Sequence, residues 1–184
     1  MSKKIWIWVL ILFAFSCFGA EFSAQQAKKI DDFLRRVAKE HKKYPFLKKV
    51  TFSQDELNSY LNLIYLKKYA PEVKTIKMKL DKNNWVSGSL TVKLTGEKYE
   101  AVPGFLKDFE LEFGGTVECD NYRVRYMFED IRINGTGFSP EILDEAFSAG
   151  QSGFKIQKSI FDWFNLMPGL KKVLVDYKKI TLFY

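Results

Sequence analysis

The residue types that carry most enzyme chemistry are scarce in this chain. His41 is the only histidine, and no cysteine or acidic residue stands at metal-ligand spacing from it. Because His41 also falls on the apolar stripe of a predicted helix, it is more typical of a partly buried helix residue than of a base or a metal ligand. The sequence contains no Gly-x-Ser-x-Gly elbow, phosphate loop or Cys-x-x-Cys pair. We therefore predict no catalytic residues, no metal site and no cofactor.

Paired carboxylates, which glycoside hydrolases use as acid and base, occur twice within the predicted strands. Glu110 and Glu112 share the polar face of one strand, and Glu129 and Asp130 are adjacent in another. The first pair is most simply explained as a solvated face. Acids from distant positions can also converge on one site, so an unrecognised hydrolase is an alternative to the non-enzymatic interpretation.

The N-terminus has the pattern of an export signal. Two lysines precede an uncharged apolar run from Ile5 to Phe15, and a stretch of mostly small residues follows up to Ala20. The sixteen residues that end at Ala20 are fewer than the roughly 20 of a spanning helix, so an uncleaved anchor is the second choice. Lipidation of Cys17 is a weaker alternative. We expect a signal peptide over 1–20 and a periplasmic or extracellular protein, anchored to a membrane if the signal is retained.

Composition indicates one globular domain over residues 21–184, because 47% hydrophobic and 28% charged residues are ordinary values for a folded chain. The aromatic content of 16% is high and predicts a bulky core or an apolar internal surface. Loss of Lys3 and Lys4 with the signal would lower the net charge of +7 by two, which leaves a basic protein. For an exported protein this charge favours anionic lipid head groups or acidic polysaccharide over nucleic acid.

Helical periodicity predicts two N-terminal helices. The first covers residues 24–44, begins after Ser23, which has the spacing of a capping box with Gln26, and ends before a proline. The second covers residues 54–69 and has a stronger capping box, formed by Ser53 and Glu56.

The first helix is basic, and the simplest explanation is a solvated helix face. The functional alternative is attraction to an anionic membrane surface. The residues expected to face that membrane are Lys28, Lys29, Arg35, Arg36, Lys39, Lys42 and Lys43.

From Val73 onward the apolar period changes to two, which predicts antiparallel strands over residues 73–135 with one apolar and one wet face. The apolar residues of the last strand sit on even numbers up to Phe128 and on odd numbers from Ile131. A β-bulge near Glu129–Asp130 would keep them on one face and bend the strand. The alternative is a strand that is buried on both faces.

The rest of the chain is predicted to be mostly helical before it returns to strands. A turn at Asn134–Gly135 leads to helices over residues 140–165, of which the first has Ser139 as its cap and Pro140 in its first turn. A hairpin over residues 170–184 ends the chain.

Four short motifs carry a family resemblance. They are Ser53–Asn58, Phe128–Gly135, Ser139–Leu143 and Met167–Val173. Together they resemble small exported bacterial domains of the LmeA type, which are similar to half-tubes of the tubular lipid-binding superfamily. The resemblance covers about residues 52–184 and implies an α+β fold in which a curled antiparallel sheet of five to six long strands wraps around, or is covered by, helices. It implies an apolar lipid groove and no catalytic residues, and the first helix departs from the family pattern.

We therefore expect an exported, non-catalytic envelope protein that binds a lipid or another amphiphile, in lipid transport or envelope maintenance. One alternative is an envelope interaction or assembly domain whose aromatic core is filled. Another is a cystatin-like or nuclear-transport-factor-like sheet that holds a small ligand. If the groove is hollow, its expected lining is Ile76, Met78, Leu80, Leu90, Val92, Leu94, Phe109, Leu111, Phe113, Val124, Tyr126 and Phe128.

Overall fold

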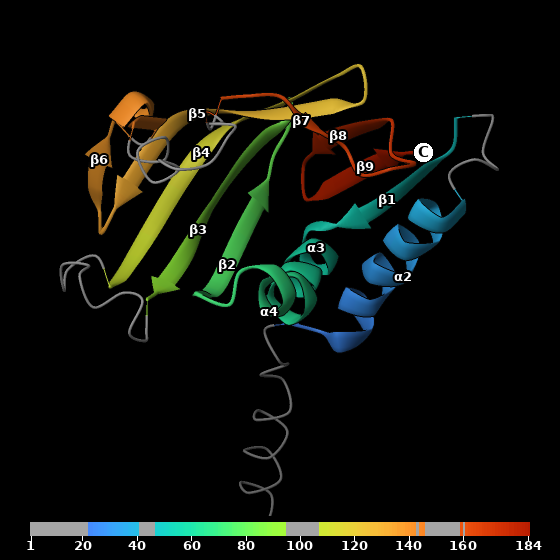
Figure 1. Cartoon of the computed structure of the whole chain (residues 1–184), viewed down its shortest axis with the longest axis horizontal. Coiled ribbons are helices and arrows are strands. Elements are labelled where there is room, and N and C mark those ends of the chain that lie inside the picture. Colours follow the sequence, from blue (N-terminus) through green and yellow to red (C-terminus); the bar gives the residue numbers. More distant parts are fainter. Residues whose placement is uncertain (1–21, 41–46, 95–106, 143, 146–158, 160) are drawn as a thin grey trace, which may run out of the picture.

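The computed structural model describes residues 22–40, 47–94, 107–142, 144–145, 159 and 161–184, so the predicted signal lies outside the described part. The described residues form an α+β fold with two antiparallel sheets (Figure 1). The larger sheet has the order β2-β3-β4-β5-β6, with β7 also paired to β5, and it does not close on itself. The smaller sheet has the order β1-β9-β8. The predicted α+β class and the antiparallel sheet are thus confirmed.

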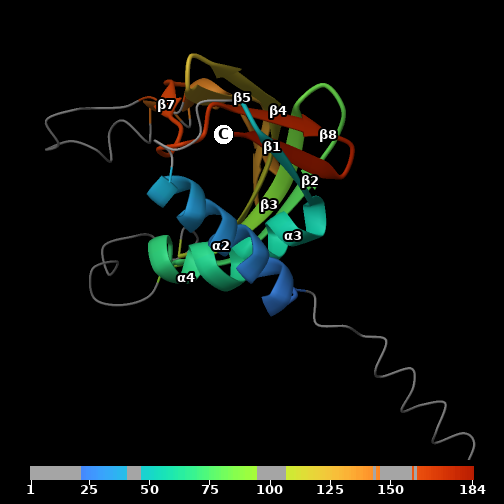
Figure 2. The same ribbon diagram turned by 90° about the vertical axis from the view of Figure 1, so that its right-hand side faces the viewer.

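Helix α2 (Ala24–Glu40) confirms the first predicted helix, and residues 41–44 lie outside the described part. Its apolar residues recur at helical spacing and form one buried stripe that faces the rest of the protein. Figure 2 shows α2 on the same side of the molecule as α3 and α4. The stripe consists of Ala27, Ile30, Phe33 and Val37.

The second predicted helix is continuous from residue 54 to 69 but changes its winding in the middle. It consists of α3 (Gln54–Tyr60), a π-helical turn η2 (Leu61–Tyr65) and α4 (Leu66–Tyr69). The predicted capping box is present, because the Glu56 N–H donates to Ser53 Oγ at 3.2 Å and the Ser53 N–H donates to Glu56 Oε2 at 2.8 Å. These bonds satisfy N–H groups that a helix start leaves free.

The predicted antiparallel strands of the larger sheet are present, and so is the predicted bulge in the last long one. Gly114 pairs with Asp130 and Gly115 pairs with Phe128, which leaves Glu129 as the extra residue. Phe128 and Ile131 therefore point to the same face although three positions separate them. The long strands are β2 (Val73–Leu80), β3 (Trp85–Lys93), β4 (Asp108–Asp120) and β5 (Arg123–Ile133).

The region after β5 agrees with the prediction only in part. β6 (Thr136–Phe138) follows the Asn134–Gly135 turn, and a helix begins at Pro140 as expected. Residues 143, 146–158 and 160 lie outside the described part, and the predicted helical end at 161–165 is wrong. In its place, β7 (Phe164–Asn165) pairs with β5.

A local turn explains why the chain is not helical just before β7. Asp162 Oδ2 accepts from the Ser159 N–H at 2.9 Å, and Ser159 Oγ accepts from the Phe161 N–H at 3.0 Å. These side chains hold the backbone in a turn, as Ser and Asp often do. The Trp163 ring then lies against Arg125, whose guanidinium carbon is 4.6 Å from the ring centroid.

The smaller sheet combines the predicted C-terminal hairpin with an unpredicted strand. β8 (Lys172–Asp176) and β9 (Lys179–Phe183) form the hairpin, and β1 (Lys49–Ser53) pairs with β9. The inward side chains of this sheet pack against the stripe of α2, which gives a core that we call the packed core. Its buried residues are Ile30, Phe33, Val37, Phe52, Leu170 and Leu182.

Candidate functional site

An apolar pocket of about 360 Å³ lies between the inner face of the larger sheet and the C-terminal hairpin. Its accessible wall is wholly apolar, and one helix residue, Leu57 of α3, contributes to it. The larger sheet contributes Met78, Leu80, Val86, Leu90, Leu111, Phe113, Val117, Tyr126 and Phe128. The hairpin contributes Val173, Val175 and Ile180.

Strand register brings the pocket residues of the larger sheet together in rows. Met78 is opposite Gly88, and Gly88 is opposite Phe113. A Cβ at position 88 would lie 3.1 Å from Phe113 Cζ and would overlap the Lys77 carbonyl oxygen. Glycine at this position therefore leaves room for the aromatic ring on the inner face.

Three aromatic rings form one wall of the pocket. The centroids of Tyr126 and Phe128 are 4.6 Å apart, and those of Phe113 and Tyr126 are 5.9 Å apart, in edge-to-face geometry. The Tyr126 hydroxyl donates to the Val86 carbonyl oxygen at 2.6 Å. Burial is the main cause that raises the pKa of Tyr126, with a smaller contribution from Glu129. The phenol is therefore neutral and bonded to the wall, and it offers no charge to a ligand.

Backbone contacts with the β2–β3 turn position the hairpin over the pocket. Asn84 accepts from the Val175 N–H through its side-chain oxygen at 2.8 Å and donates its own N–H to the Val175 carbonyl at 3.3 Å. The Lys178 N–H donates to the Leu80 carbonyl at 3.0 Å. The alternating residues of β8 then point Val173 and Val175 into the pocket.

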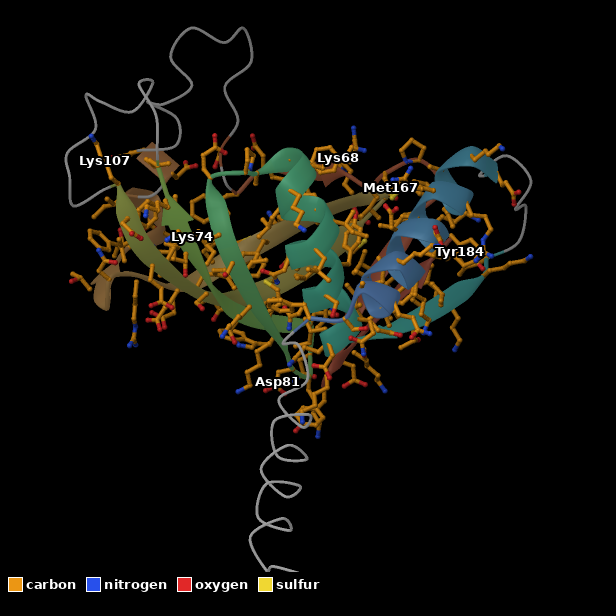
Figure 3. The ribbon with its side chains drawn as sticks, turned by 90° about the horizontal axis from the view of Figure 1, so that it is seen from below. Lys68, Lys74, Asp81, Lys107, Met167 and Tyr184 are labelled. Atoms are coloured by element: carbon orange, nitrogen blue, oxygen red, sulfur yellow. The ribbon has the colours of Figure 1, made fainter. Side chains whose placement is uncertain are left out.

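The outer edge of β2 is covered by amide side chains of the adjacent helix. Asn58 accepts from the Met78 N–H at 2.7 Å and donates to the Met78 carbonyl at 2.9 Å. Asn62 makes the same two contacts with Ile76, at 2.9 and 2.6 Å, and Gln54 accepts from the Leu80 N–H at 2.8 Å. Figure 3 shows this helix lying along β2.

The spacing of these amides matches the strand. Four helix residues advance by about 6 Å, and two strand residues advance by about 6.6 Å. The side chains of Gln54, Asn58 and Asn62 can therefore each bond to one residue of β2, and the three bonded strand residues are two positions apart. The helix thus replaces a neighbouring strand, satisfies an otherwise open sheet edge and fixes the position of Leu57 at the pocket.

Seven of the twelve predicted groove residues line the pocket. The five others do not line it: Ile76, Val92, Phe109 and Val124 lie in strands of the same sheet, and Leu94 directly follows β3. The sequence prediction omitted six pocket residues, although period-two alternation marks several of them. These are Leu57, Val86, Val117, Val173, Val175 and Ile180.

The predicted basic residues of α2 are exposed, and two of them form ion pairs. Lys29 Nζ lies 2.6 Å from Glu56 Oε1, and Arg35 Nε lies 2.7 Å from Asp31 Oδ2. The Arg36 guanidinium carbon lies 5.9 Å from the Phe33 ring centroid. Lys28 and Lys39 are exposed, whereas Lys42 and Lys43 lie outside the described residues.

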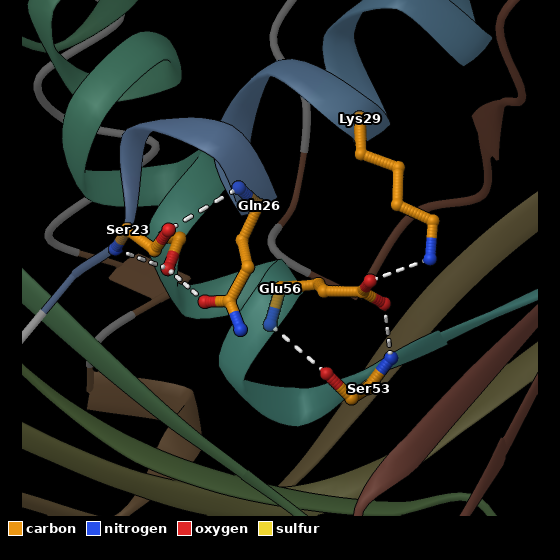
Figure 4. Close-up of polar contacts among 6 residues, drawn as sticks. Ser23, Gln26, Lys29, Ser53 and Glu56 are labelled. Carbon is orange, nitrogen blue, oxygen red and sulfur yellow. Dashed lines mark hydrogen bonds and ion pairs between the residues drawn. The ribbon is translucent and has the colours of Figure 1, made fainter.

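The start of α2 is bonded to α3 through two serines (Figure 4). Ser23 Oγ accepts from the Gln26 N–H at 3.5 Å, which is one half of the predicted capping box. The Ser23 N–H donates instead to Ser59 Oγ at 3.0 Å, and Ser59 in turn donates to Gln26 Oε1 at 3.1 Å. Together with the Lys29–Glu56 pair, this network joins the helix of the packed core to the helix at the pocket.

The predicted acid pairs do not converge on a common site. Glu110 and Glu112 are exposed, Glu129 accepts from the Thr116 hydroxyl at 3.0 Å, and Asp130 lies 3.5 Å from Arg132. Within the described ranges no group of three or more potential ligand side chains could hold a metal ion. His41 lies outside those ranges, and Cys119 is a half-buried free thiol. No helix among the described residues is both long and apolar enough to cross a membrane.

Comparison with known proteins finds no matching family model, curated protein or solved structure. The resemblance to LmeA-type domains therefore stays a prediction.

Proposed function

We propose that this protein binds the apolar chain of a lipid or another amphiphile in the pocket, as a non-catalytic component of the cell envelope. The observation that carries the proposal is the wholly apolar wall of a 360 Å³ pocket between two sheets. Protein interiors are normally close-packed, and small-molecule sites usually measure about 300–1,000 Å³. A neutral wall selects for hydrocarbon because it has no charge to pair with a polar ligand.

The sheet also supports a groove longer than the pocket. Ile76, Leu90, Leu111 and Ile133 face one another in register across four strands, and all four are half-buried. Leu90 and Leu111 line the pocket, so this apolar row continues directly from its wall. We infer that a bound chain lies along this row, as in the half-tube arrangement that the sequence resemblance implies.

Paired tryptophan variants test the proposal. Leu90 and Ile76 are cross-strand neighbours with half-buried side chains, but only Leu90 lines the pocket. Leu90→Trp should fill the pocket and weaken binding of a dansyl-labelled fatty acid at least tenfold, whereas Ile76→Trp should weaken it less. Titration by fluorescence measures both, and urea unfolding verifies that both variants fold.

Native mass spectrometry of the protein purified from membranes provides an independent test. We expect a co-purified mass that corresponds to a lipid or another amphiphile and that is lost in Leu90→Trp. Ligand-free spectra, together with equal binding of the fatty acid by wild type and Leu90→Trp, would refute the proposal. If Leu90→Trp folds and binds the fatty acid as the wild type does, this result would favour an envelope interaction domain over a lipid-binding protein.

A further inference from the structure

The outward face of the smaller sheet carries a groove of about 640 Å³. Val173 and Ile180 of the hairpin point into the apolar pocket, whereas Lys179 and Thr181 line this groove on the opposite face. The Thr51 and Thr181 hydroxyl oxygens lie 2.9 Å apart across β1 and β9. The hairpin therefore separates the wholly apolar pocket from a groove that has a mixed polar and apolar lining.

Three lysines from distant segments line the groove. Lys49 belongs to β1, Lys82 to the β2–β3 turn and Lys179 to β9. Asp176 is the one acidic residue among those that line it, and its carboxylate lies 3.1 Å from Lys179 Nζ. Within the described part of the chain, the ammonium groups of Lys49 and Lys82 form no ion pair. Three lysines and one carboxylate line this groove, so it carries a net positive charge.

An exposed aromatic residue stands beside this charge. Tyr177, in the hairpin turn, is 53% exposed, and Lys178 Nζ lies 5.3 Å from its ring centroid. Tyrosine and lysine side chains together are typical of surfaces at a membrane–water interface. The basic face of α2 differs, because the same helix carries three acidic residues, whereas one carboxylate, that of Asp176, lines the groove.

We infer that the basic groove of the smaller sheet, rather than the basic face of α2, docks the protein on the phosphate head groups of an anionic bilayer. Positive side chains near such a surface are attracted by its negative potential within about one Debye length. The choice of a bilayer over another polyanion rests on the proposed lipid function. Docking here would place the membrane on one face of the hairpin and the apolar pocket on the other.

Vesicle flotation with the full chain tests this docking surface. The vesicles are phosphatidylcholine with or without phosphatidylglycerol, and the N-terminal segment is common to every variant. Each basic residue at an anionic surface strengthens binding roughly fivefold, so Lys49→Gln/Lys82→Gln/Lys179→Gln should lose on the order of 100-fold on anionic vesicles. The matched control Lys28→Gln/Arg35→Gln/Lys39→Gln removes the same charge from α2, again including one ion-paired residue, and should lose less than tenfold.

Equal losses in the two triple variants, or a larger loss in the α2 variant, would overturn the inference. So would equal binding of the wild type to neutral and anionic vesicles. A free phosphate site is distinguished by adding inorganic phosphate at constant ionic strength: displacement from vesicles at low phosphate concentration would identify that site and refute bilayer docking. Fatty acid binding is measured separately with the dansyl probe, so failure of the pocket proposal and failure of the docking surface are distinguishable.

Discussion

The two apolar interiors of this protein are made of similar residues but differ in how they are filled. In the packed core, Phe33 lies edge-to-face with Phe52 and Tyr184, at centroid distances of 5.4 and 5.1 Å. In the pocket, Tyr126 makes equivalent contacts with Phe113 and Phe128. Helix α2 lays a full stripe of side chains against the first cluster, whereas the second has Leu57 as its one helix residue in the pocket wall. Aromatic content therefore does not distinguish a filled interior from a pocket. The difference lies in how many side chains of a neighbouring helix cover the aromatic cluster.

Truncation of one phenylalanine in each interior should produce the largest contrast. Phe52 is 1% exposed, and Phe52→Ala should cost about 3–5 kcal/mol because it removes contacts and leaves a cavity. Phe113 is half-buried and already borders the pocket, so Phe113→Ala should cost about 1–2 kcal/mol. Urea unfolding measures both, with Phe138→Ala as the exposed control. Similar costs for Phe52 and Phe113 would mean that the two interiors are equally packed.

Enlargement of a side chain should give the next largest contrast. Val37 is fully buried on the inward face of α2, so Val37→Phe should destabilise the protein by about 1–3 kcal/mol through overpacking. Val117 is half-buried and lines the pocket, so Val117→Phe should cost under about 1 kcal/mol. The same variant should reduce the affinity for the dansyl fatty acid. A large loss of stability in Val117→Phe would show that the pocket has no room for a ring, and so would contradict the comparison.

The amide ladder on β2 should contribute a smaller amount to stability. Met78 is a residue of the pocket wall, and Asn58→Ala removes the two hydrogen bonds that Asn58 makes with the Met78 backbone. The variant should lower the free energy of unfolding by about 1–2 kcal/mol. Gln25→Ala removes an exposed amide from α2 and should change stability by less than about 0.5 kcal/mol. Amide hydrogen exchange at Met78 provides a local readout, because its protection should fall in Asn58→Ala. Unchanged exchange would mean that the strand edge does not depend on the helix.

Local signals in the sequence predicted much of this architecture. The Ser53–Glu56 capping box and the even-to-odd change after Phe128 each depend on neighbouring residues, and both features are present. The C-terminal hairpin also follows from short-range alternation. The sequence does not predict strand β1, because its five residues pair with β9, about 130 positions away. A short strand of this kind carries little signal of its own.

The candidate site was harder to predict than the strands. Alternation identified Leu90, Leu111 and Phe113 as one apolar face, but it could not say which part of that face the hairpin would cover. The π-helical turn at Leu61–Tyr65 also has no simple sequence signature, although Asn62 within it bonds to β2. Whether an interior is filled depends on contacts between distant elements, which periodicity does not encode.

The ion pair between Lys29 and Glu56, which joins the helix of the packed core to the helix at the pocket, gives the smallest predicted effect on stability. Burial opposes ionisation of Glu56, but hydrogen bonds from Lys29 and Ser53 outweigh it and lower the pKa of the carboxyl. The stabilisation is therefore complete above the ordinary pKa of about 4.5 and is lost as the pH falls through the lower pKa of the folded state. Glu56→Gln should cost about 0.5–1 kcal/mol at pH 7 and progressively less below pH ~4.5, as measured by urea unfolding at several pH values. Lys29→Met keeps the capping box and should lose only part of this stability. If Glu56→Gln instead costs as much at pH ~3 as at pH 7, the charge of the carboxylate does not contribute to the contact between the packed core and the pocket.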